Sequence, residues 1–480
     1  MAKRKHRQPL PNRSPRPGLI RPAQAPAQAQ DEARRRAIWP VLPTPSQAQI
    51  LALQFQFEET ERWPPDKLLA HQLYQIQNVI DHAQATVPFH RQRLAPFAGW
   101  PPGSLTLERF RDIPIMSREE VQAAGKGVNT RRLPPGHGPT TVVSTSGSTG
   151  QPLKVLFTPV TSVMLQALSL RGHLWHGRDL SAKNVRIEHA PRSTTGTKHR
   201  RWSPMPYGGP NVKIDEAMPD SEIFEQLLRE DPDYLECAPA LLLALAQRSE
   251  ESGRRPKSLR EARTYAETLD PGVRAYCQRV WGLPIVENYG SREFGTIALQ
   301  CPQSEKLHVQ SENVFVEVLD DHDRPCGPGQ SGRILVTSLL NYGTPLIRYA
   351  LGDIVEVGRP CACGRSLPVL ERIQGRIKDL IHLPNGERLH TSFWHLLWEF
   401  PKIRQFQVVQ TSLDDIHLKF VAPVHLDESE RQKLIEGMNK RLVHEFQIHI
   451  TYHDEIPREP SGKYMTFKSE LGSLEDSMAG

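Results

Sequence analysis

The sequence has no long apolar run: no stretch of roughly 18 or more consecutive apolar residues occurs along the chain. A helix that crosses a bilayer needs about 20 such residues, so we expect no membrane span and no membrane partner. The N-terminus is basic but lacks the apolar segment and small-residue cleavage site of a secretory signal. These two absences together indicate a cytoplasmic protein.

Acidic residues are missing from residues 1–21, which hold seven lysines and arginines. Without this segment the formal charge is −1, against +6 for the whole chain. Residues 1–40, rich in Pro, Gln and Ala beyond the basic stretch, are predicted to be a disordered tail that is either solvated or docked to an acidic partner. The rest of the chain carries no basic excess, so no nucleic-acid partner is expected.

Cysteine is scarce, with six residues in 480, which argues against a disulfide framework in a chain of this kind. Cys237 and Cys277 lie in apolar helical contexts and are predicted to be core residues.

The other cysteines fall in two short segments with a histidine nearby. Cys301 and His308 are separated by six residues, and Cys361 and Cys363 by one. Three thiols and an imidazole suit a closed tetrahedral zinc site, with Cys326 as a possible substitute ligand. The alternative is that these are reduced cysteines packed in the fold. If zinc is bound, four protein ligands leave no open position, so its role would be structural.

The order of predicted elements indicates an α/β protein of more than one domain. Residues 45–130 read as helices, including one over 68–90 and one capped by Ser117 with Glu120 three residues on. From residue 139, short β-rich runs alternate with helical runs. The predicted strands span 140–144, 153–157, 285–288, 314–319 and 332–338, and the predicted helices span 161–175, 221–228 and 240–247.

A domain boundary is predicted near residue 374. It separates a large N-terminal domain of layered sheets and helices, residues 41–374, from a small mobile α+β domain, residues 375–480. The small domain is predicted to hold strands over 406–410, 416–420 and 448–453, and helices over 392–400 and 428–445.

The strongest local signal is a loop rich in glycine and hydroxyl groups, followed by Lys154. Its glycines, Gly147 and Gly150, let backbone amides turn inward to cradle a polyphosphate. Five hydroxyls add further donors: Ser144, Thr145, Ser146, Ser148 and Thr149. It is not a Walker loop, because no Gly-Lys-Ser/Thr follows at the required spacing. A flexible linker is the alternative, and the strand-like runs on both sides disfavour it.

The loop Ser144–Lys154 resembles the signature of the adenylate-forming superfamily of acyl-CoA synthetases and adenylation domains. Five further motifs resemble those of the family and follow in its order: Ala266–Leu269, Asn288–Glu293, Ile347–Asp353, Gly375–Asp379 and Pro457–Lys463. Two segments, Pro345–Tyr349 and Cys361–Arg365, resemble more narrowly the phenylacetate–CoA ligase-like and capsular-polysaccharide-associated branch.

The resemblance implies a role for each motif. Glu293 would be a catalytic residue that holds Mg²⁺, and Tyr289 would face the adenine, while Asp353 would accept hydrogen bonds from the ribose. Arg376 would reach ribose or phosphate, and Lys463 would bridge the carboxylate and the α-phosphate as a catalytic residue. The implied nucleotide-binding set is Ser144, Thr145, Ser146, Gly147, Ser148, Thr149, Gly150, Lys154, Glu267, Asn288, Tyr289, Gly290, Asp353, Arg376 and Lys378.

By the same resemblance, the protein would use ATP and Mg²⁺ to turn a small carboxylic acid, an aryl or related acid, into its acyl-adenylate with release of pyrophosphate. Coenzyme A would then accept the acyl group; an amine or a carrier-protein thiol is the alternative acceptor. The C-terminal domain would rotate at Lys378 between the two steps. A catalytically silent scaffold is a further alternative, which intact Glu293, Asp353 and Lys463 disfavour. The oligomeric state stays open, with a dimer among the options.

Overall fold

This computed structural model describes residues 41–145, 152–189, 200–377, 380–389, 393, 399–400, 402–457 and 465–471. The predicted tail, residues 1–40, lies outside the described residues. None of the helices in the described part combines the length and apolar character needed to cross a bilayer.

Helices dominate residues 45–128, as predicted. The segment holds α2 (Pro45–Thr60), α3 (Pro65–Thr86), α4 (His90–Arg93), η1 (Ala95–Phe97), α5 (Leu107–Arg111), α6 (Arg118–Ala124) and η2 (Gly125–Val128). The predicted cap of α6 is confirmed: Glu120 N–H donates to Ser117 Oγ, and the Glu120 carboxylate accepts from the Ser117 N–H.

The end of α3 differs from the prediction of a helix over residues 68–90. The helix ends at Thr86, and Val87 adopts extended backbone with φ −105° and ψ 116°. Val87 precedes Pro88, whose ring disfavours helical backbone in the residue before it. The helix therefore ends before the proline, and His90 begins the separate short helix α4.

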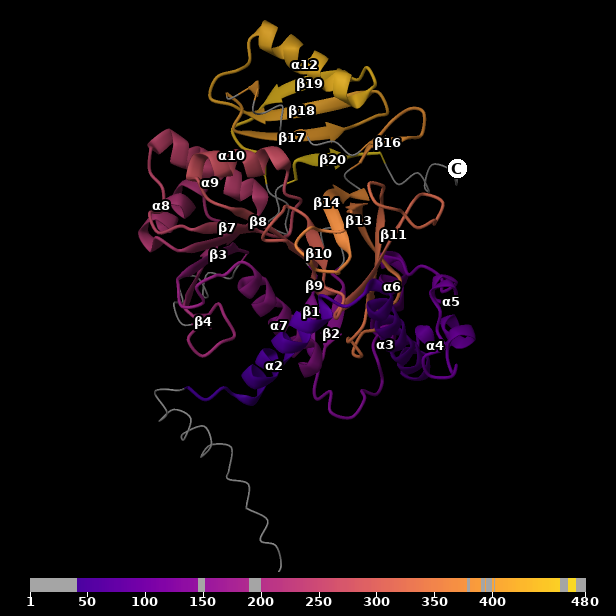
Figure 1. Ribbon diagram of the computed structural model, residues 1–480. Helices are drawn as coiled ribbons and strands as arrows, with labels where there is room; N and C mark the ends of the chain where they lie inside the picture. The colour runs from indigo at the N-terminus through magenta and orange to yellow at the C-terminus, as the bar shows by residue number, and fades with distance from the viewer. Residues whose placement is uncertain are drawn as a thin grey trace, which may run out of the picture. The chain divides into compact units, whose positions relative to one another are not determined.

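A sheet of twelve strands forms the centre of the large region (Figure 1). Its order is β11-β12-β13-β14-β10-β9-β8-β7-β6-β3-β5-β4. The strands in one half are β3 (Asn184–Glu188), β4 (Arg200–Arg201), β5 (Pro210–Asp215), β6 (Tyr234–Cys237), β7 (Glu261–Thr264) and β8 (Ile285–Ser291). Those in the other half are β9 (Gly295–Gln300), β10 (Leu307–Val309), β11 (Val314–Leu319), β12 (Ser331–Ser338), β13 (Tyr349–Val357) and β14 (Val369–Arg376).

The two halves of this sheet differ in strand direction and meet at β8. Strands β5, β3, β6, β7 and β8 pair in parallel, whereas every pairing from β8 to β11 is antiparallel. The carboxyl end of β8 therefore belongs to a parallel sheet on one side and to an antiparallel hairpin on the other. Ligands of open α/β sheets bind beyond the carboxyl ends of the parallel strands.

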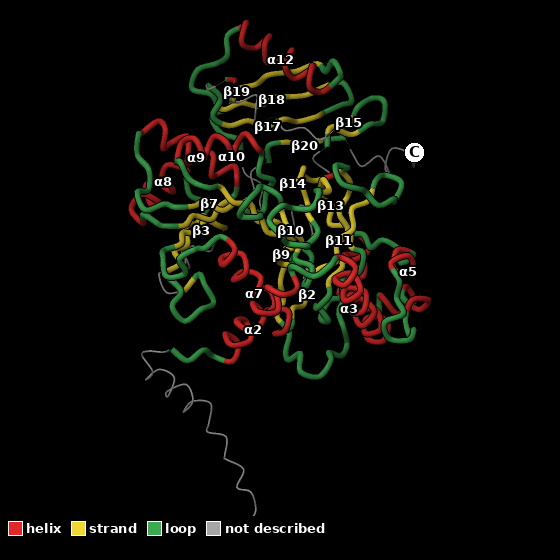
Figure 2. Tube along the Cα trace, in the orientation of Figure 1, coloured by secondary structure: helices red, strands yellow, loops and turns green. Residues whose placement is uncertain are grey.

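Helices supply the connections of the parallel half, as the alternating pattern predicted. They are α7 (Pro159–Trp175), α8 (Asp220–Glu230), α9 (Pro239–Ser252) and α10 (Pro271–Trp281). Figure 2 shows α8, α9 and α10 close to strands β3 and β7. Their buried side chains, such as Leu227, Leu242 and Trp281, form one apolar cluster with Val185 and Leu235 of the strands. This packing gives the parallel strands their rigid support.

A short hairpin borders the glycine-rich loop. Strands β1 (Thr141–Ser144) and β2 (Lys154–Phe157) pair antiparallel, with Ser144 opposite Lys154. Both strands were predicted to within one residue. The two ends of the loop therefore lie on paired strands, which does not favour the alternative that the loop is a flexible linker.

The last hundred residues form sheets of their own. β15 (Ile381–His382) pairs with β16 (Arg388–Leu389), and a second sheet has the order β19-β18-β17-β20. Its strands are β17 (Gln405–Gln410), β18 (Asp415–Val421), β19 (Gln447–Tyr452) and β20 (Phe467–Ser469). Apolar side chains of the strands, such as Phe406 and Ile416, pack with Leu434 and Met438 of α12 (Glu428–Leu442) in a cluster drawn from residues 381–467. The predicted fold class, a layered α/β region and a small α+β region, is confirmed.

Helix α12 is shorter than the predicted span of 428–445. It ends at Leu442, because the chain must turn to enter β19 at Gln447. Asn439 holds that turn, accepting a hydrogen bond from the Phe446 N–H at 3.2 Å and donating to the Phe446 carbonyl at 3.3 Å. Most of the other predicted helix, residues 392–400, lies outside the described residues.

Candidate functional site

The ends of the glycine-rich loop are held together by Thr145. Its N–H donates to the Leu153 carbonyl at 2.9 Å, and its hydroxyl accepts from the Leu153 N–H at 2.8 Å. Ser144 closes β1, and Lys154 opens β2 with an exposed side chain. The predicted residues Ser146, Gly147, Ser148, Thr149 and Gly150 lie outside the described residues.

A buried carboxylate and an arginine lie next to this hairpin. Glu293 follows β8 and is 6% exposed. Arg118, the first residue of α6, donates to Glu293 Oε1 and to Thr145 Oγ1, each at 3.3 Å. The guanidinium therefore links the base of the loop to the carboxylate predicted to hold magnesium. Sequence reasoning missed Arg118, because an arginine after a helix cap carries no pattern of its own.

Tyr289, Asp353 and Arg376 form a second group. The Tyr289 hydroxyl donates to Asp353 Oδ2 at 2.7 Å, and Arg376 Nε lies 3.7 Å from Asp353 Oδ1. Asp353 and Arg376 also face each other in the register of β13 and β14. Burial, and then the charge of Asp353, raises the pKa of Tyr289 well above its ordinary value, so the hydroxyl keeps its proton and donates.

Strands β8 and β13 link the group around Glu293 with the group around Asp353. Tyr289 and Glu293 are four residues apart at the end of β8, and Tyr349 and Asp353 are four residues apart on β13. Burial, and then the charge of Glu293, raises the pKa of Tyr349. Side chains from three predicted motifs and from α6 are therefore assembled along one junction of the sheet.

Gly290 shows why the β8 motif contains a glycine. A Cβ there would collide with the Gly295 carbonyl oxygen across the hairpin, where the register of β8 and β9 shifts. Asn288, on the same strand, pairs with Leu299 of β9.

Glu267 lies beyond the carboxyl end of β7, the parallel neighbour of β8. Its Oε2 accepts a hydrogen bond from the Ala240 N–H at the start of α9, at 3.4 Å. Ala266 before it has a φ of 69°, in the left-handed region that alanine rarely adopts. Strained backbone of this kind is concentrated at functional sites, which agrees with the predicted role of the loop.

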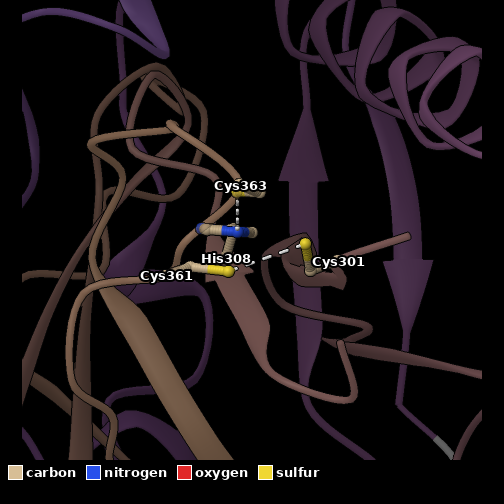
Figure 3. Close-up of side chains that lie close together, drawn as sticks. All are labelled: Cys301, His308, Cys361 and Cys363. Atoms are coloured by element: carbon tan, nitrogen blue, oxygen red, sulfur yellow. Dashed lines mark hydrogen bonds between the residues drawn. The ribbon is translucent and has the colours of Figure 1, made fainter. Parts of the chain in front are cut away.

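The four predicted zinc ligands are brought together (Figure 3). Their ligand atoms all lie within 4.8 Å of one another: Cys301 Sγ is 3.7 Å from Cys361 Sγ, and Cys363 Sγ is 3.3 Å from His308 Nε2. Burial lowers the pKa of His308 to about 4, so its imidazole is neutral at physiological pH, the form that binds metals. Cys326 is outside this group; its thiol donates to the Ser331 carbonyl at 3.5 Å.

Two predicted site residues, the hinge residue and the catalytic lysine, have no described placement. Lys378 and Lys463 lie outside the described residues, so their roles stay predictions. Arg376, two residues before Lys378, ends β14 with its side chain about half exposed.

Glu287, which sequence reasoning also missed, is buried on β8 next to the site. It lies 3.5 Å from Arg274 Nη2, and its N–H donates to Gln300 Oε1 at 2.8 Å. Burial raises its pKa to about 7 from the ordinary 4.5, against the opposing charge of Arg274. Its only signal in the sequence was a charged residue directly after the apolar pair Ile285 and Val286.

We expect Glu287→Gln to change how stability depends on pH. Between pH 4.5 and about 7 the folded protein binds a proton at Glu287 that the unfolded chain releases, so the unfolding free energy falls as pH rises. The glutamine variant lacks this loss. Its free energy of unfolding, relative to that of the wild type, should therefore rise by on the order of 3 kcal/mol across that window. Urea unfolding at a series of pH values measures the difference, and a difference independent of pH would contradict it.

Comparisons with known proteins agree with the geometry. A sequence profile described as AMP-binding enzyme matches residues 70–341, and one described as the CapK C-terminal domain matches residues 383–470. A phenylacetate–coenzyme A ligase of Thermus thermophilus is 23% identical over 381 residues, covering 75% of this chain and 83% of the relative. A phenylacetate–coenzyme A ligase of Pseudomonas putida is 22% identical over 396 residues, covering 78% and 88%.

The fold is also found among solved structures. The crystal structure of 2-hydroxyisobutyryl-CoA ligase in the postadenylation state superposes with a TM-score of 0.70. It is 17% identical in sequence, and the match covers 88% of this chain and 93% of that one. At this level of identity the likeness establishes the fold and leaves the substrate undefined.

Proposed function

The chain belongs to the family of AMP-binding enzymes and is an adenylate-forming ligase, and we propose that it activates a small carboxylic acid as the acyl-adenylate and then transfers the acyl group to coenzyme A. The observation that carries the proposal is the assembly around β8. Tyr289 contacts Asp353, and Glu293 contacts Arg118, so the groups expected to hold ribose and magnesium stand at one junction.

In the proposed first step, a carboxylate oxygen of the acid attacks the α-phosphorus of ATP. The bond from that phosphorus to the bridging oxygen breaks, and pyrophosphate leaves with the electron pair. The protein has to position two anions and neutralise the charge that builds up on the phosphate oxygens. The loop anchored by Thr145 would supply backbone donors, and Lys463 would supply a mobile positive charge near the α-phosphate.

Glu293 fits the role of a magnesium ligand. It is a buried carboxylate whose charge is already met by a cation, the Arg118 guanidinium. A magnesium ion bound there would neutralise charge on the phosphates. The Arg118 guanidinium, 3.3 Å from Glu293 Oε1, would pair with the carboxylate when the metal is absent.

Asp353 is positioned for the ribose by two contacts. Tyr289 donates to one carboxylate oxygen and Arg376 faces the other, which fixes the orientation of the carboxylate. Each carboxylate oxygen can accept more than one hydrogen bond, so the oriented carboxylate is suited to ribose hydroxyls. Tyr289 would then combine two tasks, holding Asp353 with its hydroxyl and facing the adenine with its ring.

The proposed roles of the two domains follow from the division of the strands into the twelve-stranded sheet and the separate sheets of the last hundred residues. Residues 41–374 would bind ATP and the acid, and residues 375–480 would act as a lid that carries Lys463. The second step, attack of the thiol on the acyl carbon with AMP leaving, would follow rotation of the lid at Lys378. Coenzyme A is favoured as acceptor by the names of the two curated relatives.

We expect Tyr289→Phe to weaken ATP binding while the protein stays folded. The variant loses a hydrogen bond to a charged carboxylate, so KM for ATP should rise on the order of tenfold. Initial rates of ATP–pyrophosphate exchange measure this, with Tyr207→Phe, an exposed tyrosine, as control. An unchanged KM for ATP would show that Asp353 does not bind ribose in the proposed way.

We expect Lys463→Ala to abolish most adenylate formation. Loss of the charge near the α-phosphate should lower the exchange rate on the order of 100-fold or more. Lys468→Ala is the matched control, because Lys468 is half exposed and pairs with Glu470 at 3.6 Å. Thioester formation from a prepared acyl-adenylate should survive in the Lys463 variant. If adenylation itself survives, the proposed role of the lysine is wrong.

A screen of carboxylic acids by pyrophosphate release would identify the substrate, and we expect turnover with aryl or related small acids. Mass spectrometry of reactions that contain coenzyme A, an amine or a carrier protein then identifies the acceptor. Formation of the acyl-CoA is expected. An amide or acyl-carrier product would replace the second half of the proposal, and no pyrophosphate release with any acid would favour the catalytically silent alternative.

A further inference from the structure

We propose that Cys301, His308, Cys361 and Cys363 bind one zinc ion that has a structural role. The site is separate from the proposed chemistry, because none of the four side chains is assigned to the nucleotide or the acid. It rests on the positions of four ligand atoms that come from two segments more than fifty residues apart.

Two of the six separations between ligand atoms are close to those of a tetrahedron around zinc, and all six are within 4.8 Å. With Zn–S bonds of about 2.3 Å and a Zn–N bond of about 2.0–2.1 Å, tetrahedral angles place two sulfurs about 3.8 Å apart and a sulfur and nitrogen about 3.6 Å apart. The observed separations are 3.7 Å for Cys301 Sγ and Cys361 Sγ, and 3.3 Å for Cys363 Sγ and His308 Nε2. A disulfide would need sulfurs at about 2.0 Å, so these cysteines are free thiols at metal-binding spacing.

Each ligand is placed by defined backbone. Cys301 begins the turn between β9 and β10, which is closed by a hydrogen bond from its N–H to the Lys306 carbonyl at 2.8 Å. His308 lies on β10 and is fully buried. Cys361 and Cys363 lie in the connection between β13 and β14, where Gly364 has a φ of 83° and lets the chain turn directly after Cys363.

Neighbouring side chains contact the ligands and surround the site. Ser304 Oγ lies 3.7 Å from Cys361 Sγ, and the Trp175 ring meets the His308 ring edge to face with centroids 5.8 Å apart. Partners of this kind orient ligands and limit the access of water to a metal site. Arg365, two residues after Cys363, lies over the same Trp175 ring at 4.2 Å.

The cysteine loop is in turn fixed to the helical side of the molecule by Glu61. This buried carboxylate lies 3.2 Å from Arg365 Nε and accepts a hydrogen bond from Trp175 Nε1 at 3.0 Å. The Glu61 carbonyl accepts from the Ser366 N–H at 2.7 Å. The thiols are thus held at fixed positions, which lowers the entropy lost when a metal is bound.

The chemistry of the ligands selects zinc and a structural role. Three thiolates and one imidazole in a tetrahedron form a closed site with no position for water or substrate. The ion would tie the β9–β10 turn to the connection that joins Asp353 on β13 to Arg376 on β14. It would therefore hold the connection between the strands of Asp353 and Arg376 against the β9–β10 turn.

Metal analysis of the intact protein tests the proposal. Wild-type protein, purified under reducing conditions and passed over a chelating resin, should retain one zinc per chain. Protein that retains no metal, even after refolding with zinc, would overturn the proposal, and protein that retains iron instead would overturn the assignment to zinc. These readouts do not depend on catalysis, so they stand even if the proposed ligase activity fails.

A pair of variants locates the site. Cys363→Ser should lose the zinc and lower Tm on the order of 10 °C. Cys326→Ser, which changes a partly exposed thiol outside the group, should keep both zinc and Tm. If Cys363→Ser does not fold, titration of the wild type with a mercurial, followed with a zinc-sensitive dye, should release the zinc as three thiols react. Equal zinc content in the Cys363→Ser and Cys326→Ser variants would contradict the proposed site. Zinc release that does not follow thiol modification would also contradict it.

Discussion

The hydrogen bond from Tyr289 to Asp353 joins the two halves of the large sheet at the place where the candidate site is built. Tyr289 belongs to the last parallel strand, and Asp353 to an antiparallel strand that is separated from it by three others in the sheet order. The tyrosine hydroxyl is buried and protonated, so the bond acts as a rigid spacer between the strands. Glu293 follows the first of these strands, and Arg376 lies on β14 opposite Asp353 in the strand register.

Charge balance imposes the second constraint on this junction. Glu293 is buried beside Arg118, and Glu287 is buried beside Arg274, so each carboxylate taken out of water has a guanidinium near it. The two pairs differ in exposure. Arg274 beside Glu287 is buried, and burial raises the pKa of Glu287 to about 7, whereas Arg118 is partly exposed.

The sequence predicted what depends on local pattern. The strands bordering the glycine-rich loop and the capping box at Ser117 were found because side-chain alternation and cap spacing are local signals. The end of α3 was misplaced because apolar periodicity was followed past Pro88, which is a local stop signal. The end of α12 was misplaced because it depends on the turn held by Asn439, of which the apolar periodicity gives no sign.

Contacts between distant segments could not be predicted in the same way. The motifs named Tyr289 and Asp353 through a family resemblance, but no pattern indicated that one donates to the other. Arg118 reaches Glu293 across 175 positions of sequence, and Glu61 holds the loop after Cys363 from a helix end far upstream. These contacts are set by tertiary packing, which a single sequence does not reveal.

The strand pairing near Asp353 explains why a metal cross-link would be useful there. The register of β13 and β14 shifts twice, between Ile354 and Val355 and between Glu356 and Val357. Bulges disrupt the ladder locally, so hydrogen bonds between these strands fix their relative position less firmly than in a regular pair. The proposed zinc ion, held by Cys361 and Cys363 on one side and by the β9–β10 segment on the other, would add a restraint from outside the ladder. Asp353 and Arg376 would then be placed opposite each other without relying on uniform pairing alone.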